Sequence, residues 1–577
     1  MIKKLFSYIG EYRKNSILAP IIVAIEVIIE IFIPYLMASI IDNGLNRGDM
    51  SHIFKMGILT FILAIVSLGA GVAAGRFAAN ASAGFAKNIR KALFYKIQEF
   101  SFTNIDRFST AGLITRFTTD VNNIQNAYQM IIRILVRAPF MLVFATLMTV
   151  FIGGRISLIF LFAILFLGIA LTFIIFAVFP IFTKAMGKYD NINSNLQENI
   201  SAIRVVKAYV REKYEISKFR KSTEELKDTL LKGEKIIVFV GPVMQFTMYS
   251  CILLLSWFGA HMIVSRELTT GQLMSLFAYT SNILMSLLMI SMILVNLTLS
   301  KASGERIVDV LNEEPSIKNS ENPLYNITDG SITFSNVNFS YTDNPDVLNL
   351  ENINIDIKAG ETIGIIGGTG SSKSAFVQLI PRLYDVISGE VTVGGKNVKK
   401  YDLKTLRDNV AMVLQKNVLF SGTIKENLLW GNKDATDEEM IKACKLAQAD
   451  EFIQKFPEKY DTYIEQGGTN ISGGQKQRIC IARALLKKPK ILILDDSTSA
   501  VDTKTDSLLR YAFKTEIPDI TKIIVAQRIS SVRDSDRIII LDNGKIDGFG
   551  THKELMETNK IYREVHDSQM EGRNDYE

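Results

Sequence analysis

A glycine- and serine-rich turn in the C-terminal half of the sequence has the residue types that bind phosphate. It follows the apolar stretch TIGII, precedes the helical pattern AFVQLI, and reads Gly367-Gly368-Thr369-Gly370-Ser371-Ser372-Lys373-Ser374. A strand, a tight turn and a helix in this order direct backbone N–H groups and the positive end of the helix toward an anion. We expect Lys373 to neutralise the β- and γ-phosphates of a nucleotide and the Ser374 hydroxyl to bind Mg²⁺.

This turn departs from the pattern G-x-x-x-x-G-K-[ST] at one position, where Ser372 stands in place of glycine. We expect a side chain there to crowd the phosphates or to resist an unusual backbone angle. Taken alone, the turn leaves two interpretations open, a nucleotide site and an ordinary tight turn.

Two further motifs favour the nucleotide site. In KILILDDS, an apolar strand ends at Asp495, which is where α/β sheets present ligand groups, so Asp495 is expected to hold Mg²⁺ directly or through water. Between the two motifs, Ser472-Gly473-Gly474-Gln475 opens a helical pattern and either presents donors to an anion or simply caps that helix. The three motifs in this order predict a nucleotide site with Mg²⁺ as cofactor.

The first 300 residues carry nearly all the long apolar runs of the chain. Six segments are long enough to cross about 30 Å of hydrocarbon, namely 16–41, 53–81, 131–152, 157–182, 236–264 and 271–300. Lys and Arg gather in residues 1–15 and in the loops 82–130 and 183–235, whereas the three short loops carry only Arg47, Arg155 and Arg266. This asymmetry predicts that both termini and the long loops are cytoplasmic.

The sequence therefore predicts an α-helical transmembrane domain of six spans, followed by an α/β P-loop nucleotide-binding domain. The boundaries expected are an interfacial helix over 1–15, a transmembrane domain over 16–310, a linker over 311–330 and a nucleotide-binding domain over 331–577. The net charge of +6 is small for 577 residues and does not suggest a nucleic-acid binder, and three widely spaced Cys exclude a disulfide scaffold.

The long cytoplasmic loops lack the Gly, Ser and Pro bias of flexible linkers, so they are expected to continue the membrane helices. Their tips, around 106–120 and 202–211, are candidates for contact with the nucleotide-binding domain, with ordinary surface helices as the alternative.

Polar residues inside the spans are candidates for a substrate path. Glu26 and Glu30 are four positions apart and share one helix face. Two interpretations stay open: a cavity for cationic or amphipathic compounds, or pairing of the carboxylates with Arg133 or Arg137 that only orients helices. Further candidates in the last two spans are Gln245, Asn282 and Met289.

The whole chain resembles the ATP-binding cassette (ABC) transporters, and more narrowly the exporters that fuse six membrane helices to one nucleotide-binding domain. The resemblance implies that Tyr341 stacks on adenine and that Gln415 senses Mg²⁺ and the attacking water. It identifies Ser472–Gln475 as the signature loop and 499–502 as the D-loop. In this family each ATP lies between the phosphate loop of one chain and the signature of the other, so a second half-transporter chain is expected as partner.

Two more residues depart from the family pattern. Asp496 stands where the family has its catalytic Glu, and Gln527 stands where it has the switch His. Together with Ser372 they fall on the half-site built by this chain's own phosphate loop, whereas the signature is intact. The chain thus resembles the degenerate-site subunit of heterodimeric bacterial multidrug exporters, set among the lipids of the cytoplasmic membrane and exporting an amphipathic small molecule. The alternatives are a slow homodimer, a lipid or peptide exporter subunit, and an ATP-sensing regulatory subunit.

Overall fold

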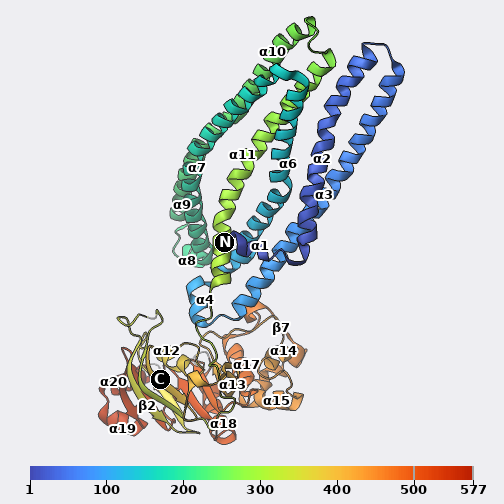
Figure 1. The fold of residues 1–577 in the computed structure, drawn as a ribbon. Coiled ribbons are helices and arrows are strands. Elements are labelled where there is room, and N and C mark those ends of the chain that lie inside the picture. The colour runs from blue at the N-terminus through green and yellow to red at the C-terminus, as the bar shows by residue number, and fades with distance from the viewer. Residues whose placement is uncertain (343, 498–500, 575–577) are drawn as a thin grey trace. The chain divides into compact units, whose positions relative to one another are not determined.

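The computed structural model describes residues 1–342, 344–497 and 501–574 of the chain (Figure 1). It divides into two compact units. Unit 1 consists of Met1–Gln98 and Ser109–Glu313, and unit 2 consists of Glu99–Phe108 and Glu314–Glu577. The short segment Glu99–Phe108 lies inside the range predicted for the transmembrane domain but packs with unit 2.

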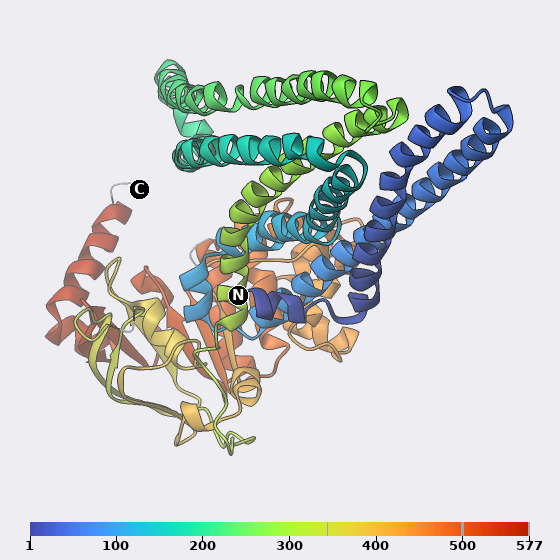
Figure 2. The ribbon, with the colours of Figure 1, turned by 45° about the horizontal axis from the view of Figure 1, so that its top comes forward.

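Unit 1 is entirely helical in its regular structure. Its α-helices are α1 (Ile2–Ser7), α2 (Arg13–Ser39), α3 (Met50–Gln98), α5 (Thr110–Thr115), α6 (Val121–Gly153), α7 (Leu158–Ser201), α8 (Ile203–Ala208), α9 (Glu212–Ile237), α10 (Val240–Val264) and α11 (Thr270–Asn312). Each of the six predicted spans falls on one of the longer helices. Figure 2 shows α2 and α3 side by side in blue. α7 packs against α9, α10 and α11.

Five helical stretches of the described residues are long and apolar enough to cross a membrane. One of them, Thr110–Ser201, contains both the third and the fourth predicted span. The chain reverses between α6 and α7 at Gly154, whose φ of 53° suits glycine, so this stretch supplies two spans (Figure 1). The prediction of a helical, multi-pass membrane domain is confirmed.

Three of the membrane helices are much longer than a bilayer requires. α3 has 49 residues, α7 has 44 and α11 has 43. At about 1.5 Å per residue these helices are on the order of 65–75 Å long, which is more than twice the hydrocarbon thickness of about 30 Å. Much of each long loop of the sequence is therefore a helical extension of a span.

Unit 2 is built on two sheets. The larger has the order β12-β11-β3-β10-β9-β6, in which all neighbours are parallel except β12 and β11. The smaller is antiparallel with the order β2-β1-β4-β5. The strands are β1 (Ile332–Phe339), β2 (Leu350–Ile357), β3 (Thr362–Ile366), β4 (Ser388–Val393), β5 (Lys396–Asn397), β6 (Val410–Val413), β7 (Gly422–Thr423), β8 (Tyr463–Ile464), β9 (Ile491–Asp495), β10 (Thr521–Val525), β11 (Arg537–Asp542) and β12 (Lys545–Gly550).

Helices surround the larger sheet, as the apolar runs of its central strands require. Every residue of β9 and β10 is buried. The α-helices of unit 2 are α4 (Phe102–Phe108), α12 (Lys373–Leu379), α13 (Leu403–Asn409), α14 (Ile424–Leu429), α15 (Asp437–Leu446), α16 (Asp450–Ile453), α17 (Gly473–Leu485), α18 (Thr503–Glu516), α19 (His552–Thr558) and α20 (Lys560–Asn574). The α/β prediction for the C-terminal half is confirmed.

Candidate nucleotide-binding site

The strand order of the larger sheet brings the sequence motifs together. β3, β10 and β9 are parallel neighbours, so their carboxyl ends lie at one edge of the sheet. The turn 367–374 leaves β3, Asp495 ends β9, and Gln527 follows β10. This edge of the sheet is where open α/β folds bind ligands.

The phosphate-loop turn joins β3 to α12, and two of its glycines face open space. A Cβ atom added at Gly368 or Gly370 would meet nothing within 4 Å, whereas one at Gly367 would lie 2.2 Å from the carbonyl oxygen of Leu541. Gly367 is therefore required for packing, and the other two glycines leave backbone exposed for a ligand. Thr369 and Ser371 belong to the same turn, and Ser371 is buried.

The Lys373 amine lies over this turn. Its Nζ donates to the carbonyl oxygens of Gly367 and Gly368, at 2.8 Å each. Desolvation lowers the pKa of Lys373, while the charges of Asp496 and Asp495 act in the opposite direction. Both of these acceptors are neutral carbonyl oxygens. A phosphate oxygen can take their place and form a stronger, charge-assisted hydrogen bond with Lys373.

Ser372 occupies the left-handed region, with φ 68° and ψ 27°, directly before α12. This conformation costs a residue with a Cβ about 1–2 kcal/mol of steric strain, whereas glycine has no such strain. The unusual backbone angle anticipated at this position is therefore present, and the serine adopts it at a cost.

Two oxygen donors suited to Mg²⁺ meet at the edge of the sheet. The Ser374 hydroxyl donates to Oδ1 of Asp495 over 3.1 Å, and Asp495 is 2% exposed. Burial raises the pKa of Asp495, and the bond from Ser374 lowers it again. Gln415 is exposed just beyond β6, the strand beside β9. Mg²⁺ prefers hard oxygen ligands, with one or two carboxylates and the phosphates of the substrate, so these residues fit it.

Asp496 and Gln527, both departures from the family pattern, contact each other. Nε2 of Gln527 donates to Oδ2 of Asp496 over 2.8 Å. The backbone of Asp496 also has positive φ, 50°, and its carbonyl accepts Nε2 of Gln477 over 3.3 Å. The carboxylate next to the Mg²⁺ ligand therefore already accepts a bond from the switch residue.

Tyr341 stands beside this edge in a cluster of aromatic rings. Its hydroxyl donates to Oε1 of Gln378 over 3.1 Å, and its ring meets Phe339 and Tyr384 edge to face. Burial, reinforced by the charges of Asp495 and Asp106, raises the pKa of Tyr341 to about 12. Tyr341 as a whole is 38% exposed, which leaves surface for stacking on a base.

The segment Ser472–Gln475 begins α17 with a complete capping box. Oγ of Ser472 accepts the N–H of Gln475 over 3.3 Å, and Oε1 of Gln475 accepts the N–H of Ser472 over 2.9 Å. Gly473 and Gly474 form the first turn between them. The capping contacts of this motif are therefore present, and its binding of an anion stays a prediction. Ser499 and Ala500 of the expected D-loop lie outside the described residues.

Comparisons with known proteins identify the family of the chain. Residues 16–288 match the family described as "ABC transporter transmembrane region", and residues 350–499 match "ABC transporter". The chain is 36% identical over 569 residues to the ABC transporter ATP-binding protein YfiB of Bacillus subtilis, covering 99% of each. The chain belongs to the ABC transporters.

Further relatives and a solved structure extend this comparison to the fold. The ABC transporter is 33% identical over 575 residues to the ATP-binding protein Rv1273c of Mycobacterium tuberculosis, with 99% of this chain and 98% of that one covered. A bacterial Atm1-family ABC exporter with ATP bound has a TM-score of 0.84 at 20% identity, over 96% of this chain and 99% of that chain. This ABC transporter therefore has the exporter fold.

In this ABC transporter, α4 packs with unit 2 through contacts that the sequence did not reveal. The Tyr384 hydroxyl donates to Oδ2 of Asp106 over 2.7 Å, and Phe102 lies 5.9 Å from the Tyr384 ring. Buried Asn104 donates to the carbonyl of Glu314 over 3.0 Å and accepts the N–H of Ser316 over 3.0 Å. The contacting residues thus begin several positions before the predicted tip at 106–120, while α8, at the other predicted tip, packs against α7 and α9.

The membrane carboxylates of the ABC transporter are paired. Arg137 on α6 reaches both carboxylates of α2, with Nη2 at 2.7 Å from Oε2 of Glu30 and Nη1 in contact with Glu26. Glu26 is 7% exposed, whereas the side chains of Arg137 and Glu30 are 28% and 29% exposed. The structure therefore contains the pairing with Arg137, which is one of the two interpretations left open by the sequence. Gln245 is exposed on α10, and Asn282 and Met289 are half-buried on α11.

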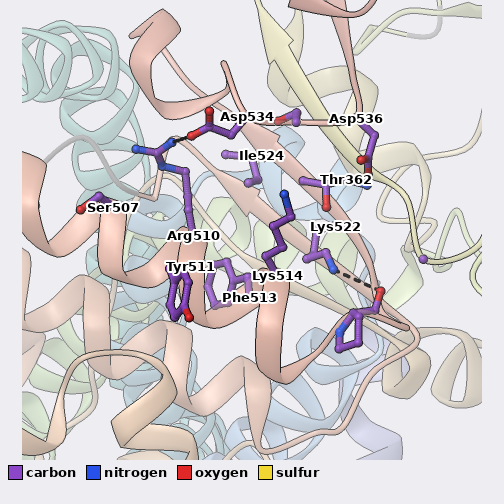
Figure 3. Close-up of a pocket in the computed structure, with 13 residues that line it drawn as sticks. Thr362, Ser507, Arg510, Tyr511, Phe513, Lys514, Lys522, Ile524, Asp534 and Asp536 are labelled. Carbon is purple, nitrogen blue, oxygen red and sulfur yellow. Dashed lines mark hydrogen bonds and ion pairs between the residues drawn. The ribbon is translucent and has the colours of Figure 1, made fainter.

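A separate pocket of about 560 Å³ lies between α18 and β10, and none of the predicted nucleotide residues line it (Figure 3). Nζ of buried Lys522 donates to the carbonyl oxygens of Ile517 and Pro518, at 3.0 and 3.4 Å. Arg510 pairs with Asp534 at 2.5 Å. Both cations thus have protein acceptors nearby, so we interpret their role as structural.

Proposed function

We propose that this chain is one half of a heterodimeric ABC exporter that uses ATP to move amphipathic, drug-like compounds across a bacterial cytoplasmic membrane, with both termini in the cytoplasm. The observation that carries the proposal is the bond between Gln527 and Asp496 at the chain's own phosphate loop. This half-site binds Mg²⁺-ATP and hydrolyses it poorly, and the signature loop completes a competent site on a different chain.

Asp496 and Gln527 differ from the family's Glu and His in the length of the side chain and in the ability to carry a proton. A general base must lie within hydrogen-bond distance of the water it activates. Aspartate is shorter than glutamate by one carbon, about 1.5 Å, and here its carboxylate also accepts the amide of Gln527. That amide can donate to a γ-phosphate but cannot take up a proton as histidine does. Lys373 and the exposed turn still serve binding, so affinity for nucleotide is retained while the cleavage step is slow.

The signature loop supports the other half of the proposal. Its capping box is complete, and α17 continues for 13 residues with most of its apolar side chains buried. A rigid helix with a well-ordered first turn is a suitable anion donor for a partner's ATP.

Coupling to the membrane helices is assigned to α4. Tyr384 contacts Asp106 of α4 on one side and Tyr341 on the other, so a base stacked on Tyr341 lies one ring away from this helix. Closure of the two nucleotide domains would pass to α3 and α6 through rigid-body motion.

The substrate class is inferred from the membrane carboxylates. Two carboxylates share the single guanidinium of Arg137 in this cluster, and this excess of acidic groups favours cationic amphipathic compounds. Half-buried Met289 offers an adaptable apolar contact. Transport of cationic and neutral dyes by Glu30→Gln vesicles tests this role. A selective loss of cationic dye supports it, and unchanged selectivity removes it.

The test of the heterodimer is co-purification followed by ATP trapping in the isolated complex. We expect a second, similar half-transporter chain to be recovered and one ATP per complex to remain unhydrolysed. Recovery of a stable homodimer that turns over both nucleotides would contradict the proposal.

An ATP-sensing regulatory subunit is the second candidate, because an Asp496 carboxylate held by Gln527 suits persistent binding without hydrolysis. Export of lipid or peptide is the remaining substrate alternative. Vesicle transport with the partner's catalytic Glu mutated separates the regulator from the exporter: transport stops if the partner's site drives export.

A further inference from the structure

The C-terminal helix α20 contacts the segment that carries Gln527. Nε2 of Gln569 donates to the carbonyl oxygen of Gln527 over 3.0 Å, and Oε1 of Gln569 accepts the N–H of Ile529 over 2.9 Å. One side-chain amide thus bonds residues on either side of Arg528, as the backbone of a neighbouring strand would. The reverse orientation of the amide would place donor against donor, so the network fixes which atom is which.

The position of Gln569 is set by the anchoring of α20. Tyr562 is fully buried in the same core as β9 and β10, and its hydroxyl lies 2.8 Å from Nδ1 of His552. Val565 packs against that core as well. Tyr562, Val565 and Gln569 are spaced three and four residues apart, so they lie on one helix face. The face that α20 buries is therefore the face that presents Gln569.

We propose that Gln569 is a positioning residue for Gln527. The Gln527 side chain donates to Asp496, and Gln569 binds the Gln527 carbonyl, so this residue is held at both its side chain and its backbone. The C-terminal helix thereby keeps the switch segment at the edge where the γ-phosphate arrives, and losing the contact lets ATP leave faster. This inference rests on the proposed function, in which Asp496 and Gln527 form the chain's own half-site.

The first test replaces the amide by an apolar side chain of similar length, Gln569→Met, in the full-length chain in nanodiscs. Loss of its hydrogen bonds should speed amide exchange at Ile529 by roughly three- to tenfold and ATP dissociation by a similar factor. Gln454→Met is the matched control, because Gln454 is also exposed and bonds only Asp450 of its own helix, at 3.2 Å. The control should change neither rate.

A second variant separates the two bonds. Gln569→Glu keeps the acceptor for Ile529 but loses the donor and sets a carboxylate against the Gln527 carbonyl. Protection at Ile529 should persist while ATP dissociates faster. In a Gln527→Ala background, Gln569→Met should have no further effect on ATP dissociation, because the amide side chain that Gln569 positions has been removed.

Two results would overturn the inference: unchanged exchange at Ile529 in Gln569→Met, or faster exchange with an unchanged ATP dissociation rate. Neither depends on hydrolysis. Rapid ATP turnover by the chain alone would instead contradict the proposed function and leave the exchange result intact, so the two failures are distinguishable.

Discussion

Two regions of the chain are candidates for anion binding, and they differ in the regularity of their backbone. The phosphate-loop edge has non-glycine residues with positive φ at Ser372 and Asp496 and a bond between Asp496 and Gln527. The start of α17 has a complete capping box and ordinary helical geometry. The irregular backbone thus lies at the phosphate-loop edge, whereas the start of α17 is regular. Under the proposed function, a chain can therefore hydrolyse its own nucleotide poorly and still offer a regular helix N-terminus to a partner.

The largest effect should come from restoring the missing groups. In Asp496→Glu with Gln527→His, the longer carboxylate reaches the attacking water and the imidazole can carry a proton. We expect ATP hydrolysis to rise on the order of 100-fold, the scale of a recovered general base. Steady-state phosphate release from purified protein measures it, and adding Lys373→Met should abolish the gain. An unchanged rate would mean that the difference between the two regions has another cause.

Removing the phosphate-loop amine should weaken binding without touching α17. Lys373→Met loses a charge-assisted bond to the phosphates, and we expect affinity for ATP to fall roughly 10- to 100-fold. Binding of a fluorescent ATP analogue checks this. Lys514→Met, an exposed lysine on the separate pocket of Figure 3, is the control and should bind ATP as the parent does.

The buried carboxylate at the sheet edge should make stability depend on Mg²⁺ and pH. Burial raises the pKa of Asp495, so the folded state without metal holds this proton more tightly than the unfolded chain. Stability contributed by the protonated form is full below the unfolded pKa and is lost as pH rises through the raised folded pKa. Asp495→Asn should therefore raise the melting temperature at neutral pH without metal, and it should remove the stabilisation by Mg²⁺-ATP.

A melting curve of Asp495→Asn that still rises fully with Mg²⁺-ATP would exclude Asp495 as a metal ligand. Asp534→Asn, in which the lost carboxylate is exposed and paired with Arg510, is the control for a change of charge alone.

The smallest effect concerns the backbone of the phosphate loop. Ser372→Gly removes the side chain expected to crowd the phosphates, so ATP affinity should improve by a factor of a few, and it relieves about 1–2 kcal/mol of left-handed backbone strain. Ser472→Ala, at the regular region, costs about 1 kcal/mol of helix capping and should leave the chain's own ATP affinity unchanged. Isothermal titration calorimetry of both variants with ATP compares the two regions directly. Equal changes in ATP affinity would contradict the proposed difference between the phosphate loop and the start of α17.

Much of the fold followed from periodicity and length. Runs of about 25 apolar residues predicted the spans, and the strand–turn–helix pattern around Lys373 predicted the sheet edge. The contact between Asp496 and Gln527 could not be predicted, because it depends on β9 and β10 being neighbours, which no local pattern encodes. Tyr384 was missed for a similar reason: its partner Asp106 is 278 positions away in the sequence.

Pairing of charges inside the membrane was only half predictable. The spacing of Glu26 and Glu30 placed both on one face of α2, but Arg133 and Arg137 were equally good partners in sequence. Packing of α2 against α6 selects Arg137, which contacts both carboxylates.

The central claim is tested most directly by the ATP turnover of this chain purified alone in lipid nanodiscs, with nucleotide occupancy measured in parallel. The account predicts bound ATP that is cleaved at a small fraction of the rate reached once the partner chain is added. Fast turnover by the isolated chain, unchanged when the partner is present, would contradict it.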